Sequence, residues 1–347
     1  MKTADELYMQ RALDLATLGQ HHARPNPIVG CVVVHQGKII GEGWHQRFGG
    51  PHAEVNALNS VADQSLLPHS RVYVTLEPCS HYGKTPPCAD LLLERGVREV
   101  VVCNLDPNPL VAGRGMQKLL DAGCQVQTGV LEEVGRHLNR RFFTFQTQKR
   151  PYVVLKWAET ADGFISLSDY SPCQISGPLA QQLVHKWRTE EQAILVGTRT
   201  ALHDNPRLNV RHWPGPAPLR IVIDKALRLP VTHHLFDDAQ PTLVYTHQQR
   251  QDASQTTYVT LPPEGVLVEQ IMQDLFQRQV QSVLVEGGTY LLEALLQNNL
   301  WDEIRVFKSP QRLGSGTKAP VLPPLPLPQQ QQLGEDQLSI YYNPAAR

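Results

Sequence analysis

The sequence has almost no net charge, and this limits the partners it can bind. Among its 347 residues, 32 lysines and arginines nearly balance 33 aspartates and glutamates, which gives a formal net charge of −1. A chain of this kind has no broad positive field for nucleic acid or anionic lipid. We therefore expect neither a nucleic acid nor a membrane surface among its partners.

Long apolar runs and clustered cysteines are also missing. The longest apolar run, residues 28–34, is interrupted by Gly30 and is far shorter than the about 18 residues that a membrane span needs. Six scattered cysteines are too few for a disulfide framework, so free thiols or metal ligands are expected. The N-terminus carries Asp5 and Glu6 in an amphipathic pattern, unlike a signal peptide. These features predict a cytoplasmic protein that does not cross a membrane.

The chain does contain two blocks of alternating short strands and helices. Its length favours two domains, and the alternation is typical of layered α/β folds. The polar run 146–151 interrupts the alternation and ends in a proline. We therefore predict domains at 1–148 and 151–347. The expected strands are 28–35, 71–76, 99–103, 125–130, 152–157, 193–196, 220–224, 242–245, 282–285 and 304–308. The main expected helices are 5–18, 86–95, 114–122, 132–145, 179–188, 267–278 and 289–297, with another beginning by His52.

The strongest chemical signal is a set of three candidate metal ligands beside a glutamate. His52 lies two residues before Glu54, and Cys79 and Cys88 follow further along the chain. Three protein ligands leave the fourth position of a catalytic zinc open for water, whereas a structural zinc is closed by four. Zinc lowers the pKa of bound water to about 7, so that hydroxide can attack a ring carbon. Glu54 is expected to carry the protons without binding the metal.

The order of these residues agrees with the signature of zinc nucleobase deaminases, His-x-Glu followed by Pro-Cys. It differs in that eight residues rather than two separate the cysteines. A structural zinc module and a deaminase acting on nucleic acid are the alternatives. Against the second, residues 1–150 hold 16 basic and 14 acidic residues and no basic run interleaved with aromatic residues. The other histidines and cysteines of this region are interpreted as loop or core residues: His21, His22, His81, Cys31, Cys103 and Cys124.

A weaker signal lies in the second block. An apolar strand sequence at 282–285 is followed by Glu286, Gly287 and Gly288 and then by a helical pattern. Glycines at such a turn let the backbone approach a phosphate, and the free amides of a helix start favour its charge. Alone, this feature is compatible with nucleotide binding, but it more often marks a turn without a ligand.

Four motifs of the first block resemble the RibD family of bifunctional riboflavin biosynthesis enzymes. They are residues 24–31, 52–54, 75–88 and 106–115, and the family normally has the long spacing between the cysteines. The resemblance implies a cytidine-deaminase-like three-layer α/β/α sandwich. It also implies zinc-dependent deamination of 2,5-diamino-6-(5-phosphoribosylamino)pyrimidin-4(3H)-one. By position, Asn26 and His45 would hold the pyrimidine, and the residues facing the ribose phosphate would be Lys84, Asp106 and Asn108.

Motifs of the second block resemble the reductase domain of the same family, which has a dihydrofolate-reductase-like α/β fold. They are residues 155–158, 162–163, 193–197, 204–211, 220–224 and 285–288. The resemblance implies that NADPH reduces the ribosyl group to ribityl, which gives 5-amino-6-(5-phosphoribitylamino)uracil. By position, the substrate contacts would be Arg188, Leu208, Arg211 and Glu286. The NADPH contacts would be Ala158, Gln174, Thr200, Asp204, Gly287 and Gly288.

One segment departs from the family. Where the family has a serine, a tryptophan and an isoleucine before a helix, residues 172–176 read Pro-Cys-Gln-Ile-Ser. The missing tryptophan would offer the nicotinamide an apolar face. An alternative is therefore an enzyme with deaminase activity only, whose second domain has become a binding or assembly module. The resemblance further implies a homo-oligomer, either a dimer or a tetramer.

Overall fold

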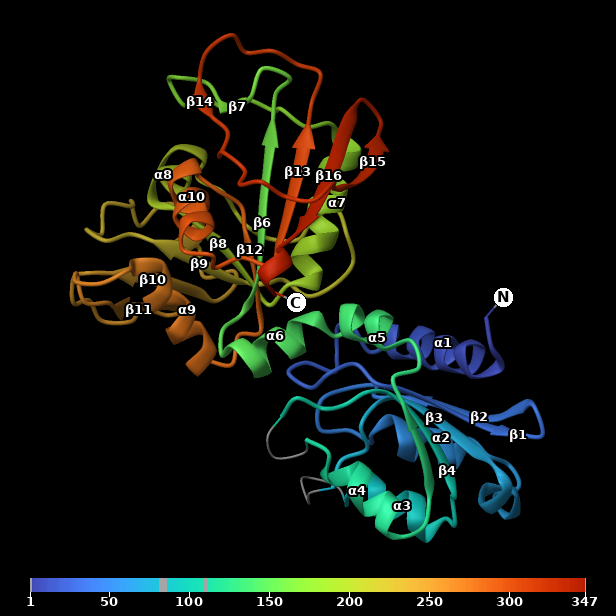
Figure 1. The fold of residues 1–347 in the computed structure, drawn as a ribbon. Helices are drawn as coiled ribbons and strands as arrows, with labels where there is room; N and C mark the ends of the chain where they lie inside the picture. Colours follow the sequence, from blue (N-terminus) through green and yellow to red (C-terminus); the bar gives the residue numbers. More distant parts are fainter. Residues whose placement is uncertain (1, 81–85, 109–111, 347) are drawn as a thin grey trace. The chain divides into compact units, whose positions relative to one another are not determined.

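The computed structural model describes residues 2–80, 86–108 and 112–346. The chain divides into two compact units, residues 1–148 and 149–347, and each unit has its own sheet (Figure 1). Two residues discussed above, His81 and Lys84, lie outside the described residues.

The first unit is built on a five-stranded sheet in the order β2-β1-β3-β4-β5. Strand β1 is antiparallel to both of its neighbours, and the other pairs are parallel. The strands are β1 (Gly30–His35), β2 (Lys38–Trp44), β3 (Arg71–Leu76), β4 (Glu99–Asn104) and β5 (Gln125–Thr128). The helices are α1 (Ala4–Thr17), α2 (Ala53–Ser60), η1 (Gln64–His69), α3 (Cys88–Glu94), α4 (Arg114–Asp121), α5 (Glu132–Leu138) and α6 (Arg140–Gln148).

Helices cover both faces of this sheet, and β1 shows why. Successive side chains of a strand point to opposite faces. Cys31 and Val33 pack in a core with residues of α2, α3 and α4, whereas Val32 and Val34 pack in a second core with residues of α1. A strand buried on both faces has a continuous apolar sequence, as β1 does. The result is the three-layer α/β/α arrangement that the sequence predicts.

Strand β2 is an element that the sequence analysis missed. Its sequence includes Gly41 and Gly43, which are unfavourable in strand interiors. A Cβ on Gly43 would lie 2.3 Å from the backbone nitrogen of Ala57 in α2. The glycine therefore lets α2 lie directly on the strand, and α2 begins immediately after His52.

The second unit contains a nine-stranded sheet in the order β11-β10-β9-β8-β12-β6-β13-β16-β15. The strands from β11 to β13 in this order are parallel, and β16 and β15 complete the sheet in antiparallel pairs. The strands are β6 (Tyr152–Glu159), β8 (Ala193–Val196), β9 (Leu219–Ile223), β10 (Thr242–Thr246), β11 (Thr256–Thr260), β12 (Ser282–Val285), β13 (Glu303–Lys308), β15 (Gln329–Leu333) and β16 (Asp336–Tyr342). A separate pair consists of β7 (Phe164–Ser166) and β14 (Thr317–Lys318).

Helices lie on both faces of this larger sheet as well (Figure 1). Helices α9 (Leu267–Gln277) and α10 (Thr289–Gln297) pack in one core, and α7 (Pro178–Glu190) and α8 (Thr198–Asp204) pack in cores on the other face. Leu284 of β12 joins these last two cores, because it pairs with Val154 of β6 and with Ile194 of β8. Short 3-10 turns occur at η2 (His234–Phe236) and η3 (Pro344–Ala346). None of the described helices combines the length and the apolar character needed to cross a membrane.

Candidate active sites

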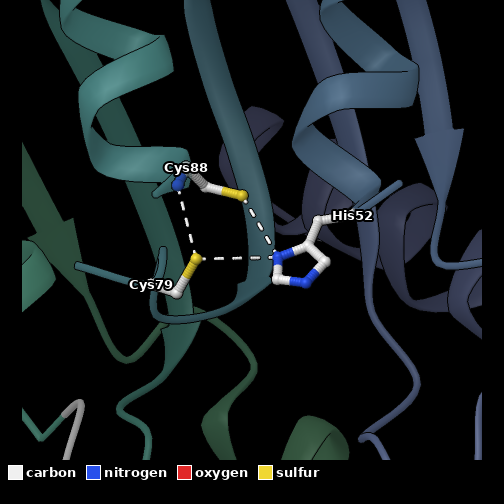
Figure 2. Close-up of side chains that lie close together, drawn as sticks. All are labelled: His52, Cys79 and Cys88. Carbon is white, nitrogen blue, oxygen red and sulfur yellow. Dashed lines mark hydrogen bonds between the residues drawn. The ribbon is translucent and has the colours of Figure 1, made fainter. Parts of the chain in front are cut away.

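Three metal-ligand candidates meet in the first unit, as Figure 2 shows. His52 is the residue before α2, Cys79 follows β3, and Cys88 is the first residue of α3. The His52 Nδ1 atom lies 3.6 Å from the sulfur of Cys79 and 3.3 Å from that of Cys88. All three ligand atoms lie within 4.8 Å of one another. One imidazole nitrogen and two sulfurs are a donor set that suits zinc.

The surroundings of the two sulfurs favour metal binding. A hydrogen bond with the Cys88 side chain is the main reason why the pKa of Cys79 is lowered, to about 4. The backbone N–H of Cys88 also donates to the Cys79 sulfur over 3.3 Å. The hydrogen bond between the two cysteine side chains, together with burial, raises the pKa of Cys88. Cys79 is therefore a thiolate at neutral pH, and a bound metal would take the place of the Cys88 proton.

Glu54 lies in the first turn of α2, beside this cluster. Its side chain is buried, and burial raises the pKa of its carboxyl to about 7. A group with such a pKa can both accept and donate a proton near neutral pH. The position and the pKa are those of a general acid–base residue.

Asn26 and His45 belong to the same site. The Nδ2 atom of Asn26 lies 3.1 Å from Nε2 of His45, and the other ring nitrogen of His45 lies 3.0 Å from the carbonyl oxygen of Pro51. Because that carbonyl only accepts, Nδ1 of His45 carries the proton and Nε2 accepts from Asn26. The His45 and His52 rings meet edge to face at 5.4 Å. These contacts bring both predicted pyrimidine-binding residues next to the metal ligands.

The predicted phosphate-binding residues are only partly described. The Asp106 side chain accepts a hydrogen bond of 2.8 Å from the backbone N–H of Asn108. This contact fixes the start of the segment that follows β4. Lys84 lies outside the described residues.

Glu77, which the sequence analysis did not single out, organises this part of the site. Its buried carboxylate accepts hydrogen bonds from the backbone N–H groups of Asp106, Gly113, Gly115 and Met116. It lies two residues before Cys79. Glu77 therefore ties the metal-binding turn to the segment that holds Asp106. The signal that could have identified Glu77 is an isolated acidic residue directly after the apolar strand β3.

The second unit has a cavity of about 790 Å³ at the carboxyl ends of β6 and β12. Nine of the ten residues predicted to contact substrate or NADPH line it: Ala158, Gln174, Arg188, Thr200, Asp204, Arg211, Glu286, Gly287 and Gly288. The tenth, Leu208, does not line the cavity, because it is buried in the core with Ile194 and Val222. Ligands of open α/β sheets bind at the carboxyl ends of the strands.

A buried ion pair forms one wall of this cavity. The Arg188 Nε and Nη2 atoms each donate to a carboxylate oxygen of Glu286 over 2.8 Å. Burial alone would raise the pKa of Glu286, but the charge and hydrogen bonds of Arg188 outweigh it and lower this pKa to about 2. Arg188 also donates to the carbonyl oxygen of Asn209, so it fixes the segment that carries Arg211.

Lys156 is a second residue that the sequence analysis missed. It lines the cavity from β6, and burial lowers the pKa of its ammonium group, opposed by the charge of Glu286. A lysine inside an otherwise apolar strand was the available signal. A protonated lysine amine can donate a proton to an oxygen atom of a ligand.

The glycine turn of the cavity fits a dinucleotide. Gly287 has a φ of 112°, which only glycine adopts readily, and Gly288 directly precedes α10. The backbone N–H of Gly288 donates to Oγ1 of Thr200 over 2.9 Å, and a Cβ on Gly288 would lie 3.1 Å from that same oxygen. A Cβ on Gly287 would meet nothing within 4 Å, so the turn leaves room for a phosphate beside its backbone.

The segment that departs from the family also lines this cavity, at residues 172–176. Just before it, the ring of Tyr170 stacks on His203 of α8 with a centroid distance of 4.4 Å. Both rings belong to residues of the cavity lining. An aromatic surface is therefore present beside the segment that lacks the family's tryptophan.

Comparison with known proteins identifies the family of this chain. The model for the "RibD C-terminal domain" matches residues 151–338, and the "Cytidine and deoxycytidylate deaminase zinc-binding region" matches residues 2–104. The riboflavin biosynthesis protein RibD of Aquifex aeolicus is 39% identical over 91% of this chain and 90% of its own length. RibD of Escherichia coli is 39% identical over 90% of each chain.

Solved structures agree over the whole chain. Acinetobacter baumannii RibD is 35% identical, covers 98% of each chain and has a TM-score of 0.89. The deaminase/reductase of Thermotoga maritima has the same identity, coverage and TM-score. These similarities confirm the predicted fold class, a deaminase-like domain followed by an α/β reductase domain. The chain therefore belongs to the RibD family of riboflavin biosynthesis enzymes, and it is a bifunctional enzyme with a zinc-dependent deaminase domain and an NADPH-dependent reductase domain.

Proposed function

We propose that the first unit deaminates 2,5-diamino-6-(5-phosphoribosylamino)pyrimidin-4(3H)-one, and that water replaces its 2-amino group with release of ammonia. His52, Cys79 and Cys88 would hold the zinc ion. When bound, zinc acts as a Lewis acid that makes water nucleophilic at neutral pH. Glu54 takes one proton from the attacking water and gives it to the ring nitrogen, and it then carries a second proton, from the new hydroxyl group, to the leaving amine. Its pKa of about 7 suits both directions of transfer.

The neighbouring polar residues orient the substrate. Asn26 and His45, which are hydrogen bonded to each other, hold the polar edge of the pyrimidine beside the metal ligands. The segment with Asp106 and Asn108 faces the ribose phosphate, as does Lys84. A lysine suits this role because its ammonium is a compact charge that pairs with phosphate.

The second unit then reduces the deaminated product to 5-amino-6-(5-phosphoribitylamino)uracil. When bound, NADPH supplies the hydride for C1′ of the sugar. The ribose ring must first open, and this requires a proton on the ring oxygen, which Lys156 donates. Arg211, an exposed cation at the cavity, binds the phosphate, while Glu286 and Arg188 form the wall against which the sugar is held. The cofactor lies along Ala158, Gln174, Thr200, Asp204, Gly287 and Gly288.

The observation that carries the deaminase assignment is the placement of Glu54 next to a cluster of one histidine and two cysteines. Its test is Glu54→Gln in the full chain. We expect bound zinc to be retained in elemental analysis, ammonia release to fall by at least a thousandfold, and NADPH oxidation with the deaminated substrate to be unchanged. The matched control is Glu42→Gln, a partly exposed glutamate of the same unit that pairs with Arg11, and this variant should keep all three properties. Ammonia release by Glu54→Gln at the native rate would refute the assignment.

The alternative of a second unit without reductase activity has its own test. It draws support from residues 172–176, which line the cavity without the family's tryptophan. With the deaminated substrate supplied directly, the loss of NADPH absorbance at high enzyme concentration reports the reductase alone. Measurable oxidation supports the bifunctional enzyme, and its absence supports a binding or assembly module.

We also propose a cellular location and an oligomeric state for the enzyme. None of the six cysteines forms a disulfide, as expected for a reducing compartment, and we place the enzyme in the cytoplasm. We expect it to form a homodimer or homotetramer. Light scattering on the purified full chain measures the second expectation, and a monomer at micromolar concentration would contradict it.

A further inference from the structure

The segment between β7 and α7, residues 167–177, runs along one side of the reductase cavity, and we call it the strap. Residues 170 and 172–176 of the strap line the cavity. At the end next to α7, Ile175 is buried, and the backbone N–H of Gly177 donates to the carboxylate of Asp336 in β16 over 2.7 Å. The strap is therefore anchored at this end.

Hydrogen bonds within the rest of the strap join neighbouring residues. The Asp169 carboxylate accepts the backbone N–H of Ser171 over 2.9 Å and its hydroxyl over 2.8 Å. Gln174, which stands where the family has a tryptophan, is exposed, and its amide donates to the carbonyl oxygen of Ser176 over 3.4 Å. These bonds shape the strap, but they do not attach it to the other walls of the cavity.

Tyr170 makes that attachment, to α8 on another wall of the cavity. Its ring stacks on the ring of His203 with a centroid distance of 4.4 Å and an angle of 13° between the ring planes. Its hydroxyl lies 3.4 Å from Nη1 of Arg199, which is long for a hydrogen bond, so the ring contact is the stronger of the two. Helix α8 also contributes Thr200 and Asp204 to the cavity lining.

The backbone of Tyr170 indicates that this contact fixes the turn. Tyr170 has a φ of 58°, in the left-handed region that a residue with a Cβ adopts at a cost in free energy. Such a conformation persists where surrounding contacts hold it. Tyr170 is half-buried and His203 is exposed, so the two rings can part without uncovering a core. The contact can therefore both hold the strap and release it.

We propose that Tyr170 and His203 form a clasp that closes the strap over the reductase cavity and slows the escape of bound NADPH. In the closed form, the stacked rings hold the strap against α8. In the open form, the rings part and the ligand leaves. Tyr170 and His203 are thus positioning residues, which fix a segment that lacks the family's tryptophan. The inference rests on the proposed reductase function.

Cys173 reports the position of the strap without any ligand, because it is a half-buried cysteine of the cavity lining that forms no disulfide. Mass spectrometry of the zinc-loaded full chain measures how fast N-ethylmaleimide modifies this residue. Tyr170→Leu and His203→Ala should each speed the modification about fivefold, the size of effect that one aromatic stack supports. His203→Phe keeps a ring against Tyr170 and should restore the native rate.

The release of NADPH tests whether the two rings act as one unit. Stopped-flow fluorescence of the reduced nicotinamide measures the dissociation rate, which should rise about fivefold in Tyr170→Leu and in His203→Ala. The double variant should release NADPH no faster than either single variant, because each substitution alone opens the clasp. Tyr170→Phe, which loses only the hydroxyl, should change the rate less than about twofold. Additive effects of the two substitutions would overturn the clasp, because they would show that the rings act separately.

The matched control is Tyr258→Leu. Tyr258 is a half-buried tyrosine of β11 whose ring lies 4.7 Å from the guanidinium carbon of Arg250, and it is not part of the cavity lining. This variant should keep the native rates of Cys173 modification and of NADPH release. Native modification rates in both Tyr170→Leu and His203→Ala would overturn the inference and leave the reductase function intact.

Failure of the reductase function gives a different result. In that case the native chain would not oxidise NADPH with the deaminated substrate. The modification of Cys173 then decides the inference alone: faster modification in both variants supports the clasp, and native rates refute it.

Discussion

The Arg188 guanidinium and the Glu286 carboxylate face each other in the second unit through two hydrogen bonds of 2.8 Å. The side chains are 11% and 10% exposed, so the charges are largely removed from water. Such pairs contribute little net stability, but loss of one partner leaves a buried charge without compensation. Lys156 and His185 also act on Glu286, and Lys156 adds a second positive charge beside it.

Glu286→Gln should therefore destabilise the second unit by about 3–5 kcal/mol at pH 7. The double variant Arg188→Met/Glu286→Gln should recover most of this loss, because it removes the unpaired charge. Calorimetric unfolding of the full chain measures both. A double variant that is less stable than Glu286→Gln would show that the pair does not act through charge.

The same ion pair predicts how the free energy of unfolding depends on pH. The pKa of Glu286 is lowered to about 2 in the folded state, whereas the pKa of a glutamate in the unfolded chain is about 4.3. Its contribution is therefore complete above about pH 4.3 and is lost as the pH falls toward 2. The difference in free energy of unfolding between the native chain and Glu286→Gln should shrink over that range. A constant difference from pH 5 to pH 2 would contradict the assignment.

His185 positions the segment that carries Arg211. Its Nδ1 atom accepts the backbone N–H of Arg211 over 3.2 Å, and Arg188, one turn later on α7, holds Asn209. Burial lowers the pKa of His185 to about 4, so its ring is neutral and can accept at pH 7. His185→Leu should raise KM for the phosphorylated substrate about tenfold and leave KM for NADPH unchanged.

The conservative variant His185→Asn offers a carbonyl oxygen in place of Nδ1 and should restore most of the substrate affinity. The ring's contribution to stability is complete above about pH 6.5 and falls as the pH drops toward 4, because the unfolded state then binds more protons. If Asn and Leu variants had the same KM for substrate, the hydrogen bond to Arg211 would have no role in binding.

Much of the fold could be predicted because buried strands have distinctive sequences. Residues 99–103 and 282–285 are short apolar runs, and both are central parallel strands. The metal cluster was also predictable, because His52, Cys79 and Cys88 supply the three ligands of a catalytic zinc in the order of the deaminase signature. The motif itself indicates which residues bind the metal, so this prediction does not require knowledge of contacts between distant residues.

The missed features depend on contacts between distant residues. A single helix was expected at 132–145, but α5 ends at Leu138 and α6 begins at Arg140. Between them, the Asn139 side chain accepts the backbone N–H of Ile28 and donates to its carbonyl oxygen. No local signal predicts a partner 111 residues away. The roles of Glu77 and Lys156 were missed for the same reason.

Glu77→Gln tests the link between the metal-binding turn and the segment that holds Asp106. An amide has one acceptor oxygen, so two of the four backbone N–H groups would lose their partner. We expect a loss of about 2–4 kcal/mol in the stability of the first unit and a higher KM for deamination, with an unchanged reductase. Glu42→Gln, a surface pair with Arg11, should cost less than about 1 kcal/mol. Equal stabilities for the two variants would show that Glu77 does not hold the segment.

Gly43→Ala tests how closely α2 must approach the sheet to build the deaminase site. An added Cβ would lie 2.3 Å from the backbone nitrogen of Ala57 and 2.6 Å from the carbonyl oxygen of Ala53, so the helix must shift. Such overpacking costs about 1–3 kcal/mol. Because α2 follows His52 and carries Glu54, zinc affinity and ammonia release should fall together, while NADPH oxidation is kept.

Lys38→Ala, at an exposed position of the same strand, should change stability by less than about 0.5 kcal/mol. Native zinc content and ammonia release in Gly43→Ala would show that the position of α2 tolerates the shift.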